Sequence, residues 1–157
     1  MATLERAIEI AAQAHAGMKD KQGESYILHP IRVMLGVDAG DAQIVAVLHD
    51  VIEDTDVTLE DIRAEGFSEA VLEALDLVTH RKDRPYSEYV IGCKRNVLAR
   101  QVKLSDLREN ASLGRILLRQ ERFDTDSSRL HRYVLSYRFL TDQISETDYR
   151  TLMVRFE

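Results

Sequence analysis

Residues 44–55 read Ile44-Val45-Ala46-Val47-Leu48-His49-Asp50-Val51-Ile52-Glu53-Asp54-Thr55, an apolar run that passes directly into four side chains able to bind metals or protons. A β-strand would turn His49 and Asp50 to opposite faces, because successive side chains alternate along a strand. On a helix, at about 100° per residue, both residues share one sector with Glu53 and Asp54, and apolar side chains cover the remaining arc. The stretch therefore predicts a buried helix with a polar pocket on one side.

Four ionisable groups on a largely buried helix carry a desolvation cost of several kcal/mol unless a partner compensates their charges. A bound cation is the simplest compensation. The alternative is that His49-Asp50 is a chance dipeptide and that Glu53-Asp54 begins a solvated turn. The shared polar sector opposite the apolar arc favours the cation site.

The composition indicates one helical domain. A chain of 157 residues with 45% hydrophobic residues can bury one good core, so we expect a single domain over residues 1–157. Few prolines, few glycines and few candidate strands predict an all-α fold. The single cysteine, Cys93, cannot form an internal disulfide and is expected to be a small core residue.

Charge and hydropathy restrict the classes of binding partner and the cellular location that we expect for the protein. The net charge of −6 argues against binding to nucleic-acid polymers, which requires a basic surface. No apolar stretch is long enough to span a membrane, and the residues from Met1 to Arg6 lack a signal-peptide pattern, so we expect a cytoplasmic protein. The sequence does not specify an oligomeric state.

Helical spacing and capping residues divide the chain into elements. Helices are predicted over about 3–17, 30–37, 41–55, 59–65, 69–79, 87–93, 97–110 and 130–140, and from 146 onward. The expected N-caps are Asp41, Thr58, Ser68, Asn96 and Ser145, with Asp61 completing a capping box at Thr58. Polar loops are predicted over 18–25 and 119–128.

Two further histidines lie near helix ends. His29 precedes Pro30 at a helix entrance, where the fixed proline backbone would hold the imidazole in one place for a metal. Its alternative role is to cap or to pack. His15, near the end of the first helix, is expected to cap or hydrogen-bond rather than to bind a metal.

Lys103, Asp106 and Asn110 are spaced three and four residues apart on a predicted helix. They therefore share one face, and a lysine, a carboxylate and an amide point the same way. An ordinary solvated Lys/Asp pair is the alternative interpretation.

The candidate metal site draws on four side chains from separate parts of the sequence: His29, His49, Asp50 and Asp106. Two imidazoles and two carboxylates suit a divalent ion such as Mn, Fe or Zn better than calcium. Such an ion lowers the pKa of a bound water and stabilises charge on a phosphoryl oxygen. Glu53 and Asp54 could orient or deprotonate that water, so the sequence predicts metal-assisted hydrolysis of a phosphate ester.

Three motifs, in order, carry a resemblance to a known family: Tyr26-Ile27-Leu28-His29-Pro30, Leu48-His49-Asp50-Val51-Ile52-Glu53-Asp54-Thr55, and Val102-Lys103-Leu104-Ser105-Asp106-Leu107-Arg108-Glu109-Asn110. They resemble the successive motifs of the HD-domain metal-dependent phosphohydrolases. Within that family, the match is to the RelA/SpoT-type alarmone hydrolases, including small single-domain ones that remove the 3′-pyrophosphate from ppGpp. The resemblance covers roughly the first three-quarters of the chain.

The resemblance implies an all-α HD-domain helical bundle that acts on a small-molecule nucleotide. It implies that the metal ligands are His29, His49, Asp50 and Asp106, and that the metal is Mn²⁺. Glu53 and Asp54 match the catalytic acidic pair that acts on the attacking water, and Lys21 and Asn110 match positions that contact the nucleotide. No synthetase domain is expected, so only the hydrolytic half of the family's chemistry is implied.

One position departs from the family pattern. The substrate loop of the family carries a basic pair whose arginine stacks on guanine, whereas here Asp20 stands in the arginine position and only Lys21 remains. An aspartate cannot provide a cation over the base, and its charge repels phosphate. Ser105 replaces the usual alanine before Asp106, which is expected to matter little.

Two other functions therefore stay open at this point. One is a non-catalytic nucleotide-sensing or interaction module that keeps a structural metal, which the aspartate at position 20 motivates. The other is an HD nucleotidase that acts on nucleoside monophosphates.

Overall fold

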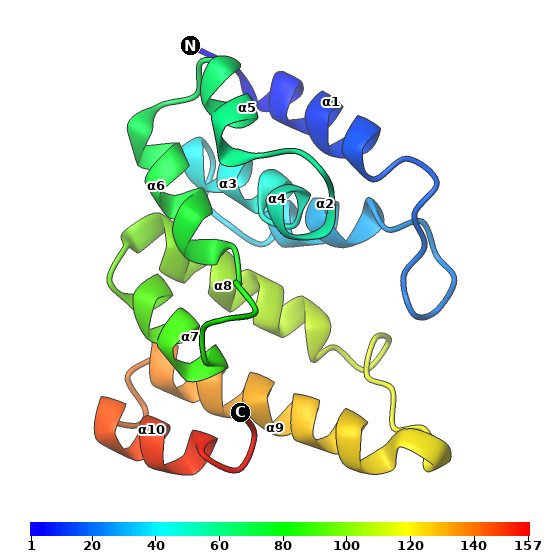
Figure 1. Cartoon of the computed structure of the whole chain (residues 1–157), viewed down its shortest axis with the longest axis vertical. Helices are drawn as coiled ribbons and strands as arrows, with labels where there is room; N and C mark the ends of the chain where they lie inside the picture. Colours follow the sequence, from blue (N-terminus) through cyan, green and yellow to red (C-terminus); the bar gives the residue numbers. More distant parts are fainter.

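The computed structural model describes residues 1–157, and all of its named elements are helices joined by loops (Figure 1). Its elements are α1 (Leu4–Ala14), α2 (Leu28–Leu35), α3 (Asp41–Leu48), α4 (Val51–Asp54), α5 (Leu59–Ala64), α6 (Glu69–Val78), α7 (Tyr86–Lys94), α8 (Val97–Asn110), the 3-10 turn η1 (Gln120–Arg122), α9 (Phe123–Leu140) and α10 (Glu146–Met153). The only extended pairing is an isolated bridge between Lys19 and Ser25. The predicted all-α fold is confirmed.

Helices α3 and α8 are the centre of the bundle. α3 packs against α1, α2, α6 and α8, while α8 also contacts α7 and α9. In Figure 1, α8 crosses the middle of the molecule, with α1 to α6 on one side of it and α9 and α10 on the other. One cluster of buried apolar side chains extends from Ala7 in α1 to Met153 in α10. α8 therefore has contacts in both halves of the molecule.

The apolar run that leads into the His-Asp pair is buried, as the sequence predicts. From Ile44 to Leu48 no residue is more than 8% exposed. Full burial of a side chain such as Val45, Val47 or Leu48 stabilises the fold by about 1.5–3 kcal/mol. This burial fixes the end of α3, where His49 and Asp50 follow.

The predicted helix over 41–55 is interrupted at His49 and Asp50, because α3 ends at Leu48 and α4 begins at Val51. Both residues keep right-handed helical dihedral angles, so the interruption is slight. Nδ1 of His49 lies 2.6 Å from the carbonyl oxygen of Ala46, which the Asp50 N–H would use in a continuous helix. The histidine side chain thus replaces one backbone hydrogen bond.

Most of the predicted caps are confirmed. Thr58 and Asp61 form the capping box of α5, and Ser68, Asn96 and Ser145 each accept a backbone N–H at their helix starts. The prediction for Asp41 is wrong. The N-cap of α3 is Gly40, whose φ of 96° turns the chain into the helix, and Asp41 is the first helical residue.

The predicted loop over 119–128 is also wrong. It contains η1 and the start of α9, which begins at Phe123. Residues 124–128 carry no apolar periodicity that would signal a helix. Acidic residues Asp124 and Asp126 occupy the first turn, where they interact favourably with the helix dipole.

Cys93 is buried in the core, as predicted, and its thiol donates to the carbonyl of Leu77 at 3.3 Å. Burial raises the pKa of the Cys93 thiol to about 12. None of the helices combines the length and the apolar character that a membrane crossing requires.

Candidate metal centre

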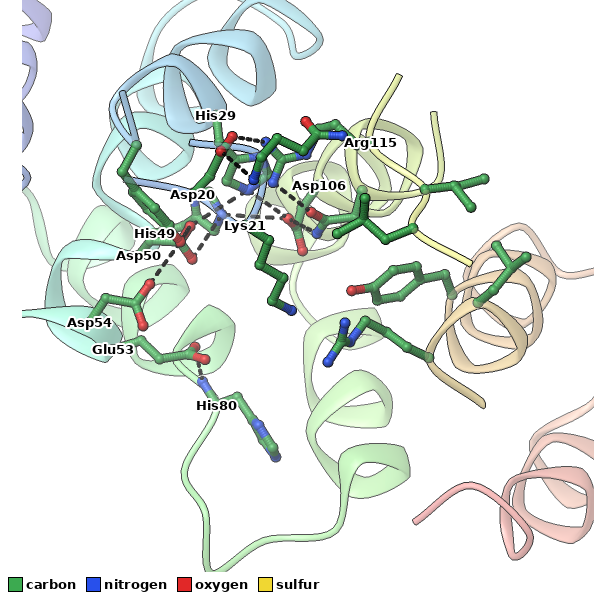
Figure 2. Close-up of a pocket in the computed structure, with 18 of the residues that line it drawn as sticks. Asp20, Lys21, His29, His49, Asp50, Glu53, Asp54, His80, Asp106 and Arg115 are labelled. Atoms are coloured by element: carbon green, nitrogen blue, oxygen red, sulfur yellow. Dashed lines mark hydrogen bonds and ion pairs between the residues drawn. The ribbon is translucent and has the colours of Figure 1, made fainter. Parts of the chain in front are cut away.

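The four predicted ligands meet at one point, although they come from three separate segments. His29 lies in α2, His49 and Asp50 form the turn between α3 and α4, and Asp106 lies in α8. Oδ1 of Asp106 is 3.2 Å from Nε2 of His29 and 3.6 Å from Nε2 of His49. Figure 2 shows the four side chains gathered on one side of a cavity.

Asp50 completes the group. Its Oδ1 lies 3.1 Å from Nε2 of His49, and its Oδ2 lies 3.5 Å from Nε2 of His29. One donor atom from each of His29, His49 and Asp50 lies within 4.8 Å of the others. These separations suit atoms that surround a single divalent cation at about 2.0–2.2 Å each.

The hydrogen bonding of His49 suits a metal ligand. A carbonyl oxygen only accepts, so the contact with Ala46 places a proton on Nδ1 of His49. Nε2 is left buried without a hydrogen-bond partner and faces the two carboxylates. Histidines that bind a metal through one ring nitrogen usually donate a hydrogen bond from the other, often to a backbone carbonyl.

The electrostatic field at this point favours positive charge. Burial lowers the pKa of His49, but the carboxylates of Asp50 and Asp106 outweigh burial and raise it to about 9. A proton or a cation is therefore stabilised between these side chains. The donor set and its field both fit a divalent metal ion.

Asp106 is held by its neighbours on α8. Nζ of Lys103 donates to Oδ2 of Asp106 at 2.8 Å, and Nδ2 of Asn110 donates to Oδ1 at 2.7 Å. The prediction that these three side chains share a face is confirmed, and the solvated Lys/Asp pair is wrong, because both charged residues are buried. Burial raises the pKa of Asp106, but Lys103 and the two histidines hold it well below its usual range.

Glu53 and Asp54 lie on α4 and line the same cavity. Oε2 of Glu53 accepts the backbone N–H of His80 at 2.9 Å. The enclosing walls desolvate the Glu53 carboxyl and raise its pKa to about 7, and the His80 N–H opposes this shift. Oδ2 of Asp54 lies 2.7 Å from the hydroxyl of Tyr26.

The cavity has a volume of about 470 Å³, within the range of small-molecule sites. Lys21, Arg115 and Arg129 line it together with the acidic residues. Figure 2 shows the Lys21 side chain extending into the open space. Asn110 also lines the cavity, so both predicted nucleotide contacts are in its wall.

Asp20 does not stand as a free charge at the cavity. Its Oδ1 accepts the backbone N–H groups of Gln22 and Glu24 at 2.9 Å, and its Oδ2 lies 3.3 Å from Nη1 of Arg115. Burial raises the pKa of Asp20, but these N–H groups and Arg115 together lower it. The expected repulsion of phosphate is thus countered by Arg115, which sequence reasoning missed, because an isolated arginine in a loop carries no signal.

His15 is the C-cap of α1, so the predicted capping role is confirmed, although its imidazole makes no hydrogen bond. Its backbone N–H caps α1, and both of its ring nitrogens are buried without a partner. The ring packs on Tyr26, with centroids 4.8 Å apart. Tyr26 itself is a second residue that sequence reasoning missed, because its hydroxyl reaches the site only through the fold.

The amino-acid sequence is similar to that of a known family and of named proteins. Residues 7–109 match the family described as "HD domain". The guanosine-3′,5′-bis(diphosphate) 3′-pyrophosphohydrolase of Aquifex aeolicus is 38% identical over 120 residues, which are 68% of this chain and 17% of that protein. The protein of the same name from Borreliella burgdorferi is 42% identical over 92 residues, 53% of this chain and 14% of that protein. The chain therefore spans less than a fifth of the length of these relatives.

A similarity in structure extends over almost the whole chain. The solved structure of a metazoan orthologue of SpoT, described as hydrolysing ppGpp, superposes with a TM-score of 0.66. The superposition covers 99% of this chain and 96% of that one, at 24% sequence identity. At this identity the likeness establishes the fold.

Proposed function

Because this chain belongs to the HD-domain family, whose match covers residues 7–109, we propose that it is a metal-dependent phosphohydrolase acting on a nucleotide 3′-pyrophosphate such as that of ppGpp. The observation that carries this proposal is the convergence of two imidazoles and two carboxylates at the wall of one cavity. The choice of nucleotide is taken from the names of the relatives from Aquifex and Borreliella.

His29, His49, Asp50 and Asp106 would hold a divalent cation, which we propose to be Mn²⁺, since mixed nitrogen and oxygen donors suit it. When bound, such an ion stabilises charge on the phosphoryl oxygens and makes a water more acidic. Glu53, with a pKa raised to about 7, is suited to exchange a proton with the attacking water at neutral pH. Asp54 would orient that water.

The reaction would break the ester bond between the ribose 3′ oxygen and the adjacent phosphorus. The water oxygen bonds to this phosphorus, the ribose 3′ oxygen leaves and gains a proton, and pyrophosphate is released. Lys21 and Asn110 would contact the nucleotide from the same cavity wall. We further propose that residues 1–157 form one domain and that the protein is located in the cytoplasm, where it would meet such a nucleotide.

The test is a metal-reconstitution assay. Protein stripped with a chelator and then given Mn²⁺ should release pyrophosphate and GDP from ppGpp, and Asp106→Ala should abolish both metal binding and turnover. Full activity of the stripped protein would contradict the proposal. Parallel assays with Mg²⁺, Zn²⁺ and Fe²⁺ identify the preferred metal.

A second candidate is a nucleotide sensor that retains a structural metal. The observation that favours it is the Asp20 carboxylate, which occupies the position of a base-stacking arginine in the family and is bound to Arg115 instead. If the protein bound nucleotides but hydrolysed none of them with Mn²⁺, Mg²⁺, Zn²⁺ or Fe²⁺, the result would support the sensor. Faster turnover of 5′-monophosphates than of ppGpp would instead support a nucleotidase.

A further inference from the structure

The Tyr26 hydroxyl lies between two carboxylates of the candidate metal centre. Its oxygen is 2.8 Å from Oδ2 of Asp50 and 2.7 Å from Oδ2 of Asp54. The ring is fixed from two sides, by His15 with centroids 4.8 Å apart and by the edge of His29 at 6.2 Å. The hydroxyl therefore has a defined position relative to both acids.

Tyr26 is the only outer partner that Asp50 has. Two of the other three candidate ligands have their own partners: His49 has the Ala46 carbonyl, and Asp106 has Lys103 and Asn110. Beyond the two histidines, the side chain of Asp50 contacts the Tyr26 hydroxyl alone. The side chain of Asp54 likewise has Tyr26 as its only hydrogen-bond partner.

A hydroxyl group carries one proton, so it can donate to only one of two ionised carboxylates. The second short contact between oxygen atoms is repulsive unless positive charge lies nearby. A cation held by Asp50 would supply that charge. The Tyr26 hydroxyl can therefore keep both short contacts, to Asp50 and to Asp54, when a cation is bound.

We propose that Tyr26 is a positioning residue that ties the metal ligand Asp50 to the water-orienting acid Asp54 through one hydroxyl group. Partners of this kind set the orientation of a metal ligand, and their loss typically costs 10- to 100-fold in affinity or activity. The Asp50 half of the inference concerns cation binding alone. The Asp54 half rests on the proposed hydrolase function.

The test compares Tyr26→Phe with Tyr86→Phe. Tyr86 lines the same cavity, and its hydroxyl is buried without any partner, so its removal is a matched control. Titration calorimetry with Mn²⁺ on stripped protein should show at least a tenfold weaker affinity for Tyr26→Phe. Tyr86→Phe should bind Mn²⁺ as the unmodified protein does, and circular dichroism should show both variants folded.

Asp54→Asn provides a second variant. Its amide can donate to the Tyr26 oxygen, which leaves the hydroxyl proton for Asp50, so Mn²⁺ affinity should stay within about twofold. At saturating Mn²⁺, Tyr26→Phe should lower kcat about tenfold with KM little changed, since Asp54 loses its only partner.

Unchanged Mn²⁺ affinity in Tyr26→Phe would overturn the inference, as would an equal loss in Tyr86→Phe. A tenfold loss of affinity in Asp54→Asn would also overturn it, even if Tyr26→Phe failed to fold. If the unmodified protein bound Mn²⁺ but hydrolysed no nucleotide, the proposed function would fail while the calorimetry still decided the role of Tyr26.

Discussion

Lys103 and Asp106 form a buried ion pair at the centre of the site. Their atoms approach to 2.8 Å, and the ammonium also lies 4.9 Å from the centroid of the Tyr89 ring. Burial alone would lower the pKa of Lys103, but Asp106 and the tyrosines raise it well above its usual value. Each charge therefore depends on the other.

Removing the lysine charge should destabilise the metal-free protein. Lys103→Met removes the largest compensation of the buried Asp106 carboxylate, and we expect the free energy of unfolding to fall by about 3 kcal/mol in urea titrations with chelator present. Arg63→Met is the control, because its pair with Glu69 is exposed and its loss should cost at most about 1 kcal/mol. Similar losses in the two variants would contradict the buried-pair account.

Arg115 and Asp20 compensate each other at the cavity wall. Arg115→Ala should expose the aspartate charge to an anionic substrate, and we expect KM for ppGpp to rise about fivefold, equivalent to about 1 kcal/mol. Asp20→Asn combined with Arg115→Ala removes both charges and should bring KM back towards its original value. Steady-state kinetics measure this coupling; a double variant as impaired as Arg115→Ala would refute it.

Among the elements, the ones with strong apolar periodicity and side-chain caps could be predicted from the sequence. Ser68, Asn96 and Ser145 mark helix starts because each side chain satisfies a free backbone N–H in its own first turn. Such signals are local. The break between α3 and α4 and the first turn of α9 involve hydrogen bonds of the His49 and Asp126 side chains, which no periodicity reveals.

The first turn of α9 contains an ion pair that makes the stability of the folded state depend on pH. The buried Asp126 carboxylate accepts the backbone N–H and two guanidinium N–H groups of Arg119, at 3.1, 2.9 and 2.7 Å. Arg119 lowers the pKa of Asp126 well below its usual range. A lowered acid pKa stabilises the folded state above the unfolded pKa of about 3.9, and this contribution is lost as the pH falls further.

Asp126→Asn tests this pH dependence. We expect the difference in free energy of unfolding between the unmodified protein and the variant to be constant between pH 7 and 5. It should then shrink as the pH falls below about 4, when Asp126 begins to take up a proton. Urea titrations at several pH values measure it, and a difference that grows towards low pH would have the wrong sign.

For the molecule as a whole, the site joins parts that are distant in the sequence. α2 and the turn after α3 contribute three of the candidate ligands, and α8 contributes the fourth while also contacting α9. The resemblance to the HD family anticipated which residues converge. The pairing of Asp20 with Arg115 and the Tyr26 bridge could not be predicted, because both join residues that no spacing rule connects.

Cation binding should stabilise the whole fold, since the ligands come from separate elements. At a free Mn²⁺ concentration of 100 times Kd, linkage predicts about 2.7 kcal/mol of added stability. For a domain of this size, Tm should then rise by about 5–10 °C in scanning calorimetry. His49→Ala should lose the rise; a rise that persisted in this variant would place the cation elsewhere.

The position of the cation is the most direct measurement of the central claim. Anomalous diffraction from crystals grown with Mn²⁺ should give one strong peak within bonding distance of His29, His49, Asp50 and Asp106. A peak away from these four side chains, or no peak at saturating Mn²⁺, would contradict the claim that they form a metal centre.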